Sequence, residues 1–244
     1  MRAVLEAHGL VRSFGAEVAV AGIDLTVAPG EIRAIVGLNG AGKTTLMRLM
    51  LGMLRPDRGR ALVLGNDAYA APPSTWRVVG HLIETPFAYP ELTVRENLMA
   101  GALLHGVPED EVERSVASAM ADFELEQWEQ RRAAHLSLGN RQRLGLATAL
   151  VHLPSIVVLD EPANALDPAG VVFVRDLLQD FAERGAAVLV SSHHFDQLAR
   201  VAHRITVLHR GREVGSLDPH GFELEQRFFD LVYAADRELG KARR

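Results

Sequence analysis

The sequence contains no cysteine and only two lysines among its 244 residues. The absence of cysteine excludes disulfide bonds and cysteine metal sites, and it leaves the cellular compartment open. No apolar run approaches the roughly 18–20 residues needed to span a bilayer. The first residues also lack the apolar core of a signal peptide. We therefore expect a soluble, cytosolic chain.

The sequence also has no excess of basic over acidic residues. The formal net charge is −5 and the sequence pI is about 6.1. This balance gives no bulk signal for binding a polyanion, so we expect no nucleic-acid partner. The length is enough for one large α/β domain, with or without an insertion, and for a sizeable core.

The clearest motif is the glycine-rich stretch GLNGAGKTT at residues 37–45, which follows an apolar run and precedes an apolar-periodic one. Gly37, Gly42, Lys43 and Thr44 satisfy G-x-x-x-x-G-K-[ST], the phosphate-binding loop. Glycines let successive backbone N–H groups curl round an anion, and the following helix directs its positive dipole end at that anion. Lys43 can reach the β- and γ-phosphates of a nucleotide, and the Thr44 hydroxyl can bind Mg²⁺. The other loop residues of the predicted site are Asn39, Gly40, Ala41 and Thr45.

A second buried-strand pattern, residues 155–159, ends in the adjacent carboxylates Asp160 and Glu161. One carboxylate can hold Mg²⁺ through its water shell, and the next can polarise an attacking water. Two acids at a strand end can also be ordinary surface residues. The phosphate loop earlier in the chain favours the catalytic interpretation.

Two further positions predict helix starts. Ser137 stands where an N-cap is expected, with Gly139 close behind, so a helix N-terminus is again available to an anion. Locally, Ser137 as a plain cap is an equally good interpretation. Asp167 precedes a proline at the first helical position, which makes Asp167 a structural N-cap first and a functional residue second.

Alternating stretches at 3–12 and 17–25 predict two antiparallel strands, with Phe14 between them. Phe14 could stack on adenine or pack within the turn, and its spacing alone favours packing. A later core strand ends in Ser191-Ser192-His193-His194. A histidine at the end of such a strand, beside a nucleotide, is in a position to bond the γ-phosphate.

Residues 86–154 predict a helical insertion between strand-rich halves. Thr93-x-x-Glu96 predicts a capping box, and a second helix is expected over about 108–122. The stretch 91–130 holds ten acidic side chains against two arginines, which predicts a solvated helical face. The expected division is a nucleotide-binding core at 1–85 and 155–215, a helical subdomain at 86–154, and a helical tail at 216–244.

The ordered set GLNGAGKTT, LSLGNRQRLGLA, IVVLDEP, NALD and VSSH resembles the ATP-binding-cassette (ABC) ATPases from about residue 4 to residue 215. The resemblance implies an α/β fold: a phosphate-loop ATPase core with an antiparallel β subdomain and an inserted helical subdomain. It also implies ATP hydrolysis, with ATP and Mg²⁺ bound. Phe14 matches the adenine-stacking aromatic, Asp160 the Mg²⁺-associated aspartate, Glu161 the general base, and His193 the switch histidine.

Ser137 and Gly139 match the family signature that contacts the ATP held by the opposite subunit. The signature is usually LSGGQ, and here Leu138 adds a side chain where glycine is usual. The resemblance implies a head-to-tail pair with a second ATPase subunit, as a homodimer or a heterodimer. It also implies a separate transmembrane permease subunit, which would hold the chain at the cytoplasmic face of the cell membrane.

Glu84 is the second departure, because it occupies the position of the family's usual glutamine and could there join the Mg²⁺ shell. Glu84, the SLG signature and GHLIETPFAYPELTVRENL look like the subgroup that exports bacitracin, lantibiotics and related peptides for self-protection. The alternative is a non-transport ABC ATPase, either an assembly factor or a membrane-coupled regulatory ATPase. DNA-maintenance members carry a long coiled coil and translation members usually fuse two cassettes, and this sequence has neither feature.

Overall fold

The computed structural model describes residues 3–192 and 200–242, which form a mixed α/β fold with two sheets. The smaller sheet is antiparallel, with strand order β2-β1-β4-β5. Its first pair confirms the two strands predicted at the start of the chain. Its strands are β1 (Leu5–Phe14), β2 (Glu17–Val27), β4 (Arg58–Val63) and β5 (Asn66–Asp67).

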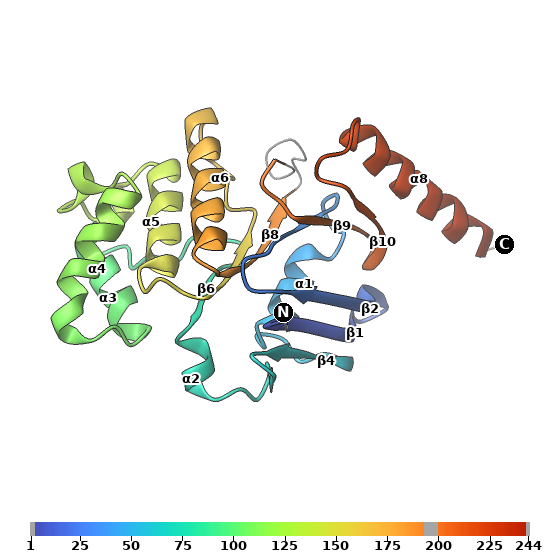
Figure 1. The fold of residues 1–244 in the computed structure, drawn as a ribbon, viewed down its shortest axis with the longest axis horizontal. Coiled ribbons are helices and arrows are strands. Elements are labelled where there is room, and N and C mark those ends of the chain that lie inside the picture. Colours follow the sequence, from blue (N-terminus) through green and yellow to red (C-terminus); the bar gives the residue numbers. More distant parts are fainter. Residues whose placement is uncertain (1–2, 193–199, 243–244) are drawn as a thin grey trace.

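The larger sheet has the order β10-β9-β3-β8-β7-β6 and is parallel except for the edge strand β10 (Figure 1). Every residue of β3, β7 and β8 is buried, because other layers cover both faces of the sheet. The carboxyl ends of these strands meet at one edge. The strands are β3 (Ile32–Val36), β6 (Val79–Leu82), β7 (Ile156–Asp160), β8 (Ala187–Ser192), β9 (Arg204–His209) and β10 (Arg212–Leu217).

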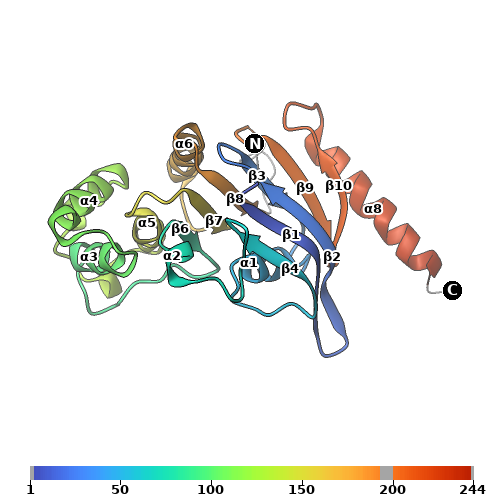
Figure 2. The same ribbon diagram turned by 60° about the horizontal axis from the view of Figure 1, so that its bottom comes forward.

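Strand residues alternate between two hydrophobic clusters. Ile156 and Val158 of β7 face the cluster that contains the small sheet and α1 (Lys43–Met50). Val157 and Leu159 face the opposite cluster, which is covered by helices (Figure 2). This alternation is the period-2 geometry of a strand buried on both sides. The remaining helices are α2 (Pro73–Trp76), α3 (Val94–Leu104), α4 (Glu109–Asp122), η1 (Glu126–Trp128), η2 (Ala133–His135), α5 (Leu138–Leu150), α6 (Pro168–Glu183) and α8 (Leu224–Ala242).

The predicted helix starts are confirmed by their hydrogen bonds. Thr93 and Glu96 form a complete capping box at α3. Ser137 Oγ accepts from the Asn140 amide at 3.2 Å, and Asp167 Oδ1 accepts from the Gly170 amide at 2.8 Å. The acidic side chains of 91–130 are exposed, apart from a partly buried Glu129.

Two local details differ from the sequence-based expectation. The apolar pattern of residues 78–83 predicts a strand that Glu84 closes, but β6 ends at Leu82. Glu84 lies in the turn beyond the strand, with φ of 64°. The short helix α2 was not expected, because four residues carry too little periodicity to be recognised.

Candidate functional site

The glycine-rich loop joins β3 to α1, and close packing explains two of its glycines. A Cβ at Gly37 would lie 2.4 Å from the Leu208 carbonyl oxygen, and one at Gly42 would lie 2.3 Å from that of Ala19. Gly42 also has φ of 102°, which side chains disfavour. The Gly211 amide donates to the Ala41 carbonyl at 2.9 Å and ties the loop to the β9–β10 turn. The loop amides are thus held at the N-terminus of α1, where an anion is favoured.

Lys43 is the cation of this loop. Its side chain is buried, its Nζ donates to the Gly37 carbonyl at 2.7 Å, and it lies 3.3 Å from Glu161 Oε1. The ammonium is therefore positioned between the loop and the end of β7. Of the other predicted loop residues, Asn39 and Gly40 are exposed, Ala41 is buried, and Thr44 and Thr45 are half-buried.

The carboxyl ends of the strands bring together the predicted acids and the loop. Thr44 Oγ1 donates to Asp160 Oδ2 at 2.6 Å, and Ser191 Oγ donates to the other oxygen of Asp160. The Glu161 amide donates to Ser191 Oγ at 3.0 Å. Ser191 pairs with Asp160 in the parallel register of β7 and β8. The bridging role of Ser191 was missed, although its place at the end of an adjacent strand was the available signal.

The donor set of this cluster fits Mg²⁺. A hydroxyl from Thr44 and a carboxylate from Asp160 are hard oxygen ligands, and Mg²⁺ is usually held by one or two carboxylates together with substrate phosphates. Within residues 3–192 and 200–242, no group of three or more His, Cys, Asp or Glu residues could hold a metal alone. A magnesium ion held by Thr44 and Asp160 would take phosphate or water oxygens as its other ligands.

Glu84 forms an ion pair with Arg48 in this structure. Its Oε2 is 2.6 Å from Nη2 of Arg48, at the end of α1, and about half of the Glu84 side chain is exposed. Nothing in the sequence had indicated this ion pair. The role of Glu84 as a metal ligand stays a prediction.

Phe14 closes the hairpin between β1 and β2, and 48% of it is exposed, so the turn does not bury its ring. The Arg12 guanidinium lies 5.0 Å from the ring centroid. Asp57 fixes the two residues that precede Phe14 and its ring contact: its carboxylate accepts from Arg12 Nη1 at 3.0 Å and from the Ser13 amide at 2.7 Å. Arg12 and Asp57 were missed, because residues 45 positions apart give no local signal.

The signature residues lie at the start of α5, which is apart from α1 in both views (Figures 1 and 2). Gln142 Nε2 donates to the Pro162 carbonyl at 2.9 Å and links α5 to the loop after Glu161. Leu138 is 63% exposed, so its added side chain extends into solvent. Ser137 is therefore presented at the surface and not to the phosphate loop of its own chain. His193, the remaining predicted site residue, lies outside the described residues.

A groove next to Glu84 was also not anticipated. It has a volume of about 320 Å³ and lies between α3, α5 and the end of β6. Phe87 and Tyr89 meet edge to face at its mouth, with ring centroids 4.9 Å apart, and Phe87 is 64% exposed. Burial lowers the pKa of His81 and of His105 in the groove wall, which keeps both imidazoles neutral near pH 7. We call this feature, defined by Phe87, Tyr89, His81, His105 and Leu104, the aromatic groove.

Comparison with known proteins gives one consistent result. The protein family described as ABC transporter matches residues 20–164. The bacitracin transport ATP-binding protein BcrA of Enterococcus faecalis is 36% identical over 216 residues, covering 88% of this chain and 69% of that protein. The Nod factor export ATP-binding protein I of Rhizobium sp. strain N33 is 32% identical, covering 90% and 72%.

Solved structures agree with the sequence relatives. The ATP-binding subunit of an ABC transporter superposes with a TM-score of 0.82 at 29% identity, covering 94% of each chain. A dimeric bacterial ABC transporter cassette superposes with a TM-score of 0.81 at 22% identity, covering 89% of this chain and 100% of the other. At this identity the similarity is one of fold. In the part of this chain that the structure describes, no helix is long and apolar enough to cross a membrane.

Proposed function

The chain belongs to the ABC transporter family of ATP-binding proteins, and from this membership we propose that its ATP hydrolysis drives a separate membrane subunit that exports a peptide antibiotic or another drug. It is an ATP-binding subunit of an ABC transporter and an ATPase. The observation that carries the proposal is the cluster of Lys43, Thr44, Asp160 and Glu161, joined through Ser191.

In the proposed reaction, Lys43 and the loop amides hold the β- and γ-phosphates of ATP, and Phe14 stacks on the base. Glu161 takes a proton from a water molecule whose oxygen attacks the γ-phosphorus. The bond from that phosphorus to the bridging oxygen breaks, and ADP leaves with the electron pair. Magnesium held by Thr44 and Asp160 would neutralise charge that develops on the phosphate oxygens. We further propose that His193 bonds the γ-phosphate, as it would in the family.

We also propose a head-to-tail dimer with a second ATPase subunit. Ser137 and Gly139 lie at the exposed start of α5, apart from the phosphate loop of the same chain. A helix N-terminus favours an anion, so the partner's ATP is a suitable ligand for it. The cassette of similar fold was solved as a dimer, which supports this arrangement. Asp167, the N-cap of α6, would lie near the same nucleotide.

The aromatic groove is the surface we propose for docking the membrane subunit, which would place the chain at the cytoplasmic face of the membrane. Phe87 and Leu104 are both more than 60% exposed at its edge, as contact residues for another protein would be. The groove borders the helical subdomain, 86–154, and the core, 1–85 and 155–215, in our proposed division. A partner bound there would contact both parts and would therefore be moved when they shift relative to each other. The tail, 216–244, lies beyond β10.

The substrate class rests on the relatives. BcrA proteins of two species are named for bacitracin transport, and other relatives for Nod factor export. In the cells that make this protein, loss of the chain is expected to increase sensitivity to bacitracin-like peptides, with rescue by the wild-type gene and not by a Lys43→Ala gene. Unchanged sensitivity, together with normal ATPase activity of the purified chain, would favour the non-transport alternative.

Arg12 lies over the Phe14 ring and is held there by Asp57. Removing Arg12 should weaken binding of the adenine base of ATP but not of the phosphates. An Arg12→Ala change is expected to raise the Kd for ATP about threefold, and Phe14→Ala about tenfold or more, since aromatic stacking on a base contributes about 1–3 kcal/mol. Tripolyphosphate has no base, so its Kd should be unchanged in both variants. Titration calorimetry with the two ligands measures this. Arg60→Ala, an exposed change in the same sheet, is the control, and equal losses for both ligands would contradict base stacking.

Glu84→Gln should keep ATP affinity within about tenfold, because the carboxylate is half-exposed and its charge effects are screened. We expect the change to alter the ratio of transport to hydrolysis, because Glu84 and Arg48 border the aromatic groove. Parallel measurements of ATPase rate and antibiotic resistance test this.

Arg48→Gln is the matched variant for Glu84→Gln. If the ion pair between Glu84 and Arg48 sets the ratio of transport to hydrolysis, the two changes should alter that ratio equally. If only Glu84→Gln slows hydrolysis, Glu84 acts on the metal. If both leave hydrolysis and resistance at wild-type values, position 84 has no part in coupling.

A further inference from the structure

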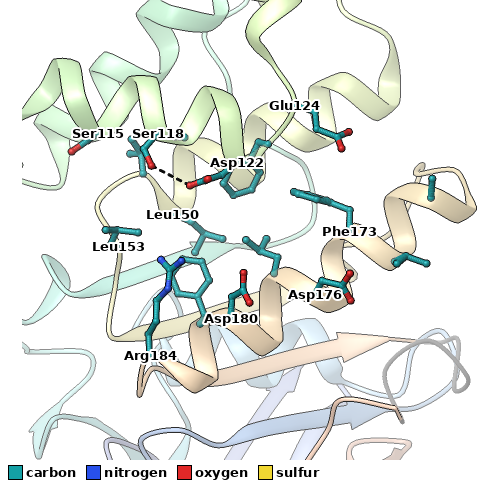
Figure 3. A pocket seen from close by; sticks show the side chains of 17 residues that line it. Ser115, Ser118, Asp122, Glu124, Leu150, Leu153, Phe173, Asp176, Asp180 and Arg184 are labelled. Carbon is teal, nitrogen blue, oxygen red and sulfur yellow. Dashed lines mark hydrogen bonds between the residues drawn. The ribbon is translucent and has the colours of Figure 1, made fainter.

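A second cavity, of about 450 Å³, lies between α4, α6 and the end of α5 (Figure 3). It shares no residue with the phosphate site or with the aromatic groove. Its volume is in the range of small-molecule sites, roughly 300–1,000 Å³. Its floor is apolar and partly aromatic, and it is formed by Leu150, Val151, Phe173, Leu177 and Phe181.

The rim of this cavity carries four carboxylates, Asp122, Glu124, Asp176 and Asp180, and one guanidinium, Arg184. Two of the acids have cations beside them. Glu124 Oε2 is 2.8 Å from Arg143, and Asp176 is 3.4 Å from the neighbouring Arg175.

The other two acids lack such partners. Asp122 accepts a hydrogen bond from Ser118 at 3.2 Å, and Asp180 makes no side-chain hydrogen bond or ion pair within the described ranges. Figure 3 shows Asp122 on the α4 side of the cavity and Asp180 on the α6 side, with Leu150 between them. Arg184 is the one cationic residue among those that line the cavity, against four carboxylates. Asp122 and Asp180, which are in no ion pair within the described part of the chain, therefore face one apolar space from opposite walls and leave it with an excess of negative charge.

The position of Asp122 does not benefit its own helix. Asp122 is the last residue of α4, and the C-terminus of a helix carries the negative end of the dipole. A carboxylate there is electrostatically unfavourable for α4. Its charge is better matched by a cation that comes from outside the helix.

We propose that this cavity binds a small hydrophobic organic cation. The body of such a ligand would remove the apolar floor from water, and its charge would lie between Asp122 and Asp180. A hydrophobic anion of the same shape would contact the same apolar floor but would be repelled by the carboxylates of the rim. Because α4 belongs to the helical insertion and α6 to the core, the ligand would contact both parts of the chain.

Tetraphenylphosphonium and tetraphenylborate test this directly, because they share one shape and carry opposite charges. Titration calorimetry on the purified chain is expected to give one site for tetraphenylphosphonium with a Kd below about 100 µM. Tetraphenylborate should bind at least about tenfold more weakly. Added NaCl should weaken the phosphonium, since the rim carboxylates are exposed.

Three variants locate the site. Asp122→Asn with Asp180→Asn should weaken tetraphenylphosphonium about tenfold, because two exposed charges are removed. Glu126→Gln with Glu183→Gln makes the same charge change at exposed positions outside the cavity and should have no effect. Val172→Trp, at an exposed lining position on α6, should block the cavity. Equal binding of the two probes, or an unchanged Kd in the Asp122/Asp180 variant, would overturn the proposal.

Discussion

A Lys43→Ala protein is expected to lose ATP turnover by ~10³-fold, or about 4 kcal/mol of transition-state stabilisation. The reason is that Lys43 supplies the buried cation next to the phosphate loop, with Nζ 2.7 Å from the Gly37 carbonyl oxygen. No other side chain in the loop can replace a charge aimed at the β- and γ-phosphates. Steady-state ATPase assays measure the loss, and ATP binding should weaken in parallel.

The change also leaves Glu161 without the ammonium that lies 3.3 Å from it. Lys43→Met keeps most of the aliphatic stem and serves as the matched variant, so an equal loss in both proteins identifies the charge as the cause. Thermal unfolding of both variants checks that the fold is retained. If either folded variant kept more than about a tenth of wild-type turnover, this loop would not be the catalytic site.

Local chemistry made part of the fold predictable. The starts of α3, α5 and α6 were found because the side chains of Thr93, Ser137 and Asp167 accept from the amide three positions ahead in the same helix. Those bonds need no tertiary contact, so the residue type and its spacing are enough. Strands β1 and β2 of the small sheet were also found from a local pattern, the alternation of their apolar residues.

The phosphate site was predictable for a different reason. Parallel strands end at one edge of a sheet, so a loop after β3 and acids after β7 must come close together. The structure joins them through Thr44 and Asp160, at 2.6 Å. The assignment of Glu161 as the base, and of Asp160 to the metal, remains a prediction that depends on the nucleotide.

The contacts that could not be predicted join residues far apart in sequence. Arg48 with Glu84, Gln142 with the Pro162 carbonyl, and Arg12 with Asp57 each connect different elements. Arginine and glutamine side chains are long and can reach many partners, so their types alone do not select one. The turn at Glu84 was misplaced because a left-handed residue other than glycine has no strong sequence signal.

Glu161→Gln is expected to preserve ATP binding while lowering hydrolysis by ~10²–10⁴-fold, the range for removing a general base. The substitution retains the shape of the side chain and the backbone bond from the residue 161 amide to Ser191 Oγ, at 3.0 Å. It also removes a negative charge from the neighbourhood of the phosphates. Because ATP then persists, an ATP-bound dimer should accumulate, and size-exclusion chromatography with Mg-ATP measures it.

Changes at Ser137 show whether that dimer uses the proposed sandwich. Serine, asparagine and aspartate are comparable N-caps, so Ser137→Asn and Ser137→Asp should both leave α5 folded. In the Glu161→Gln background, aspartate would set a negative charge against the partner's ATP, whereas asparagine would add none. We expect the dimer to be lost with Ser137→Asp and largely kept with Ser137→Asn. A dimer that survives in both proteins would mean that the start of α5 does not face the partner's nucleotide, and that the two chains associate through another surface.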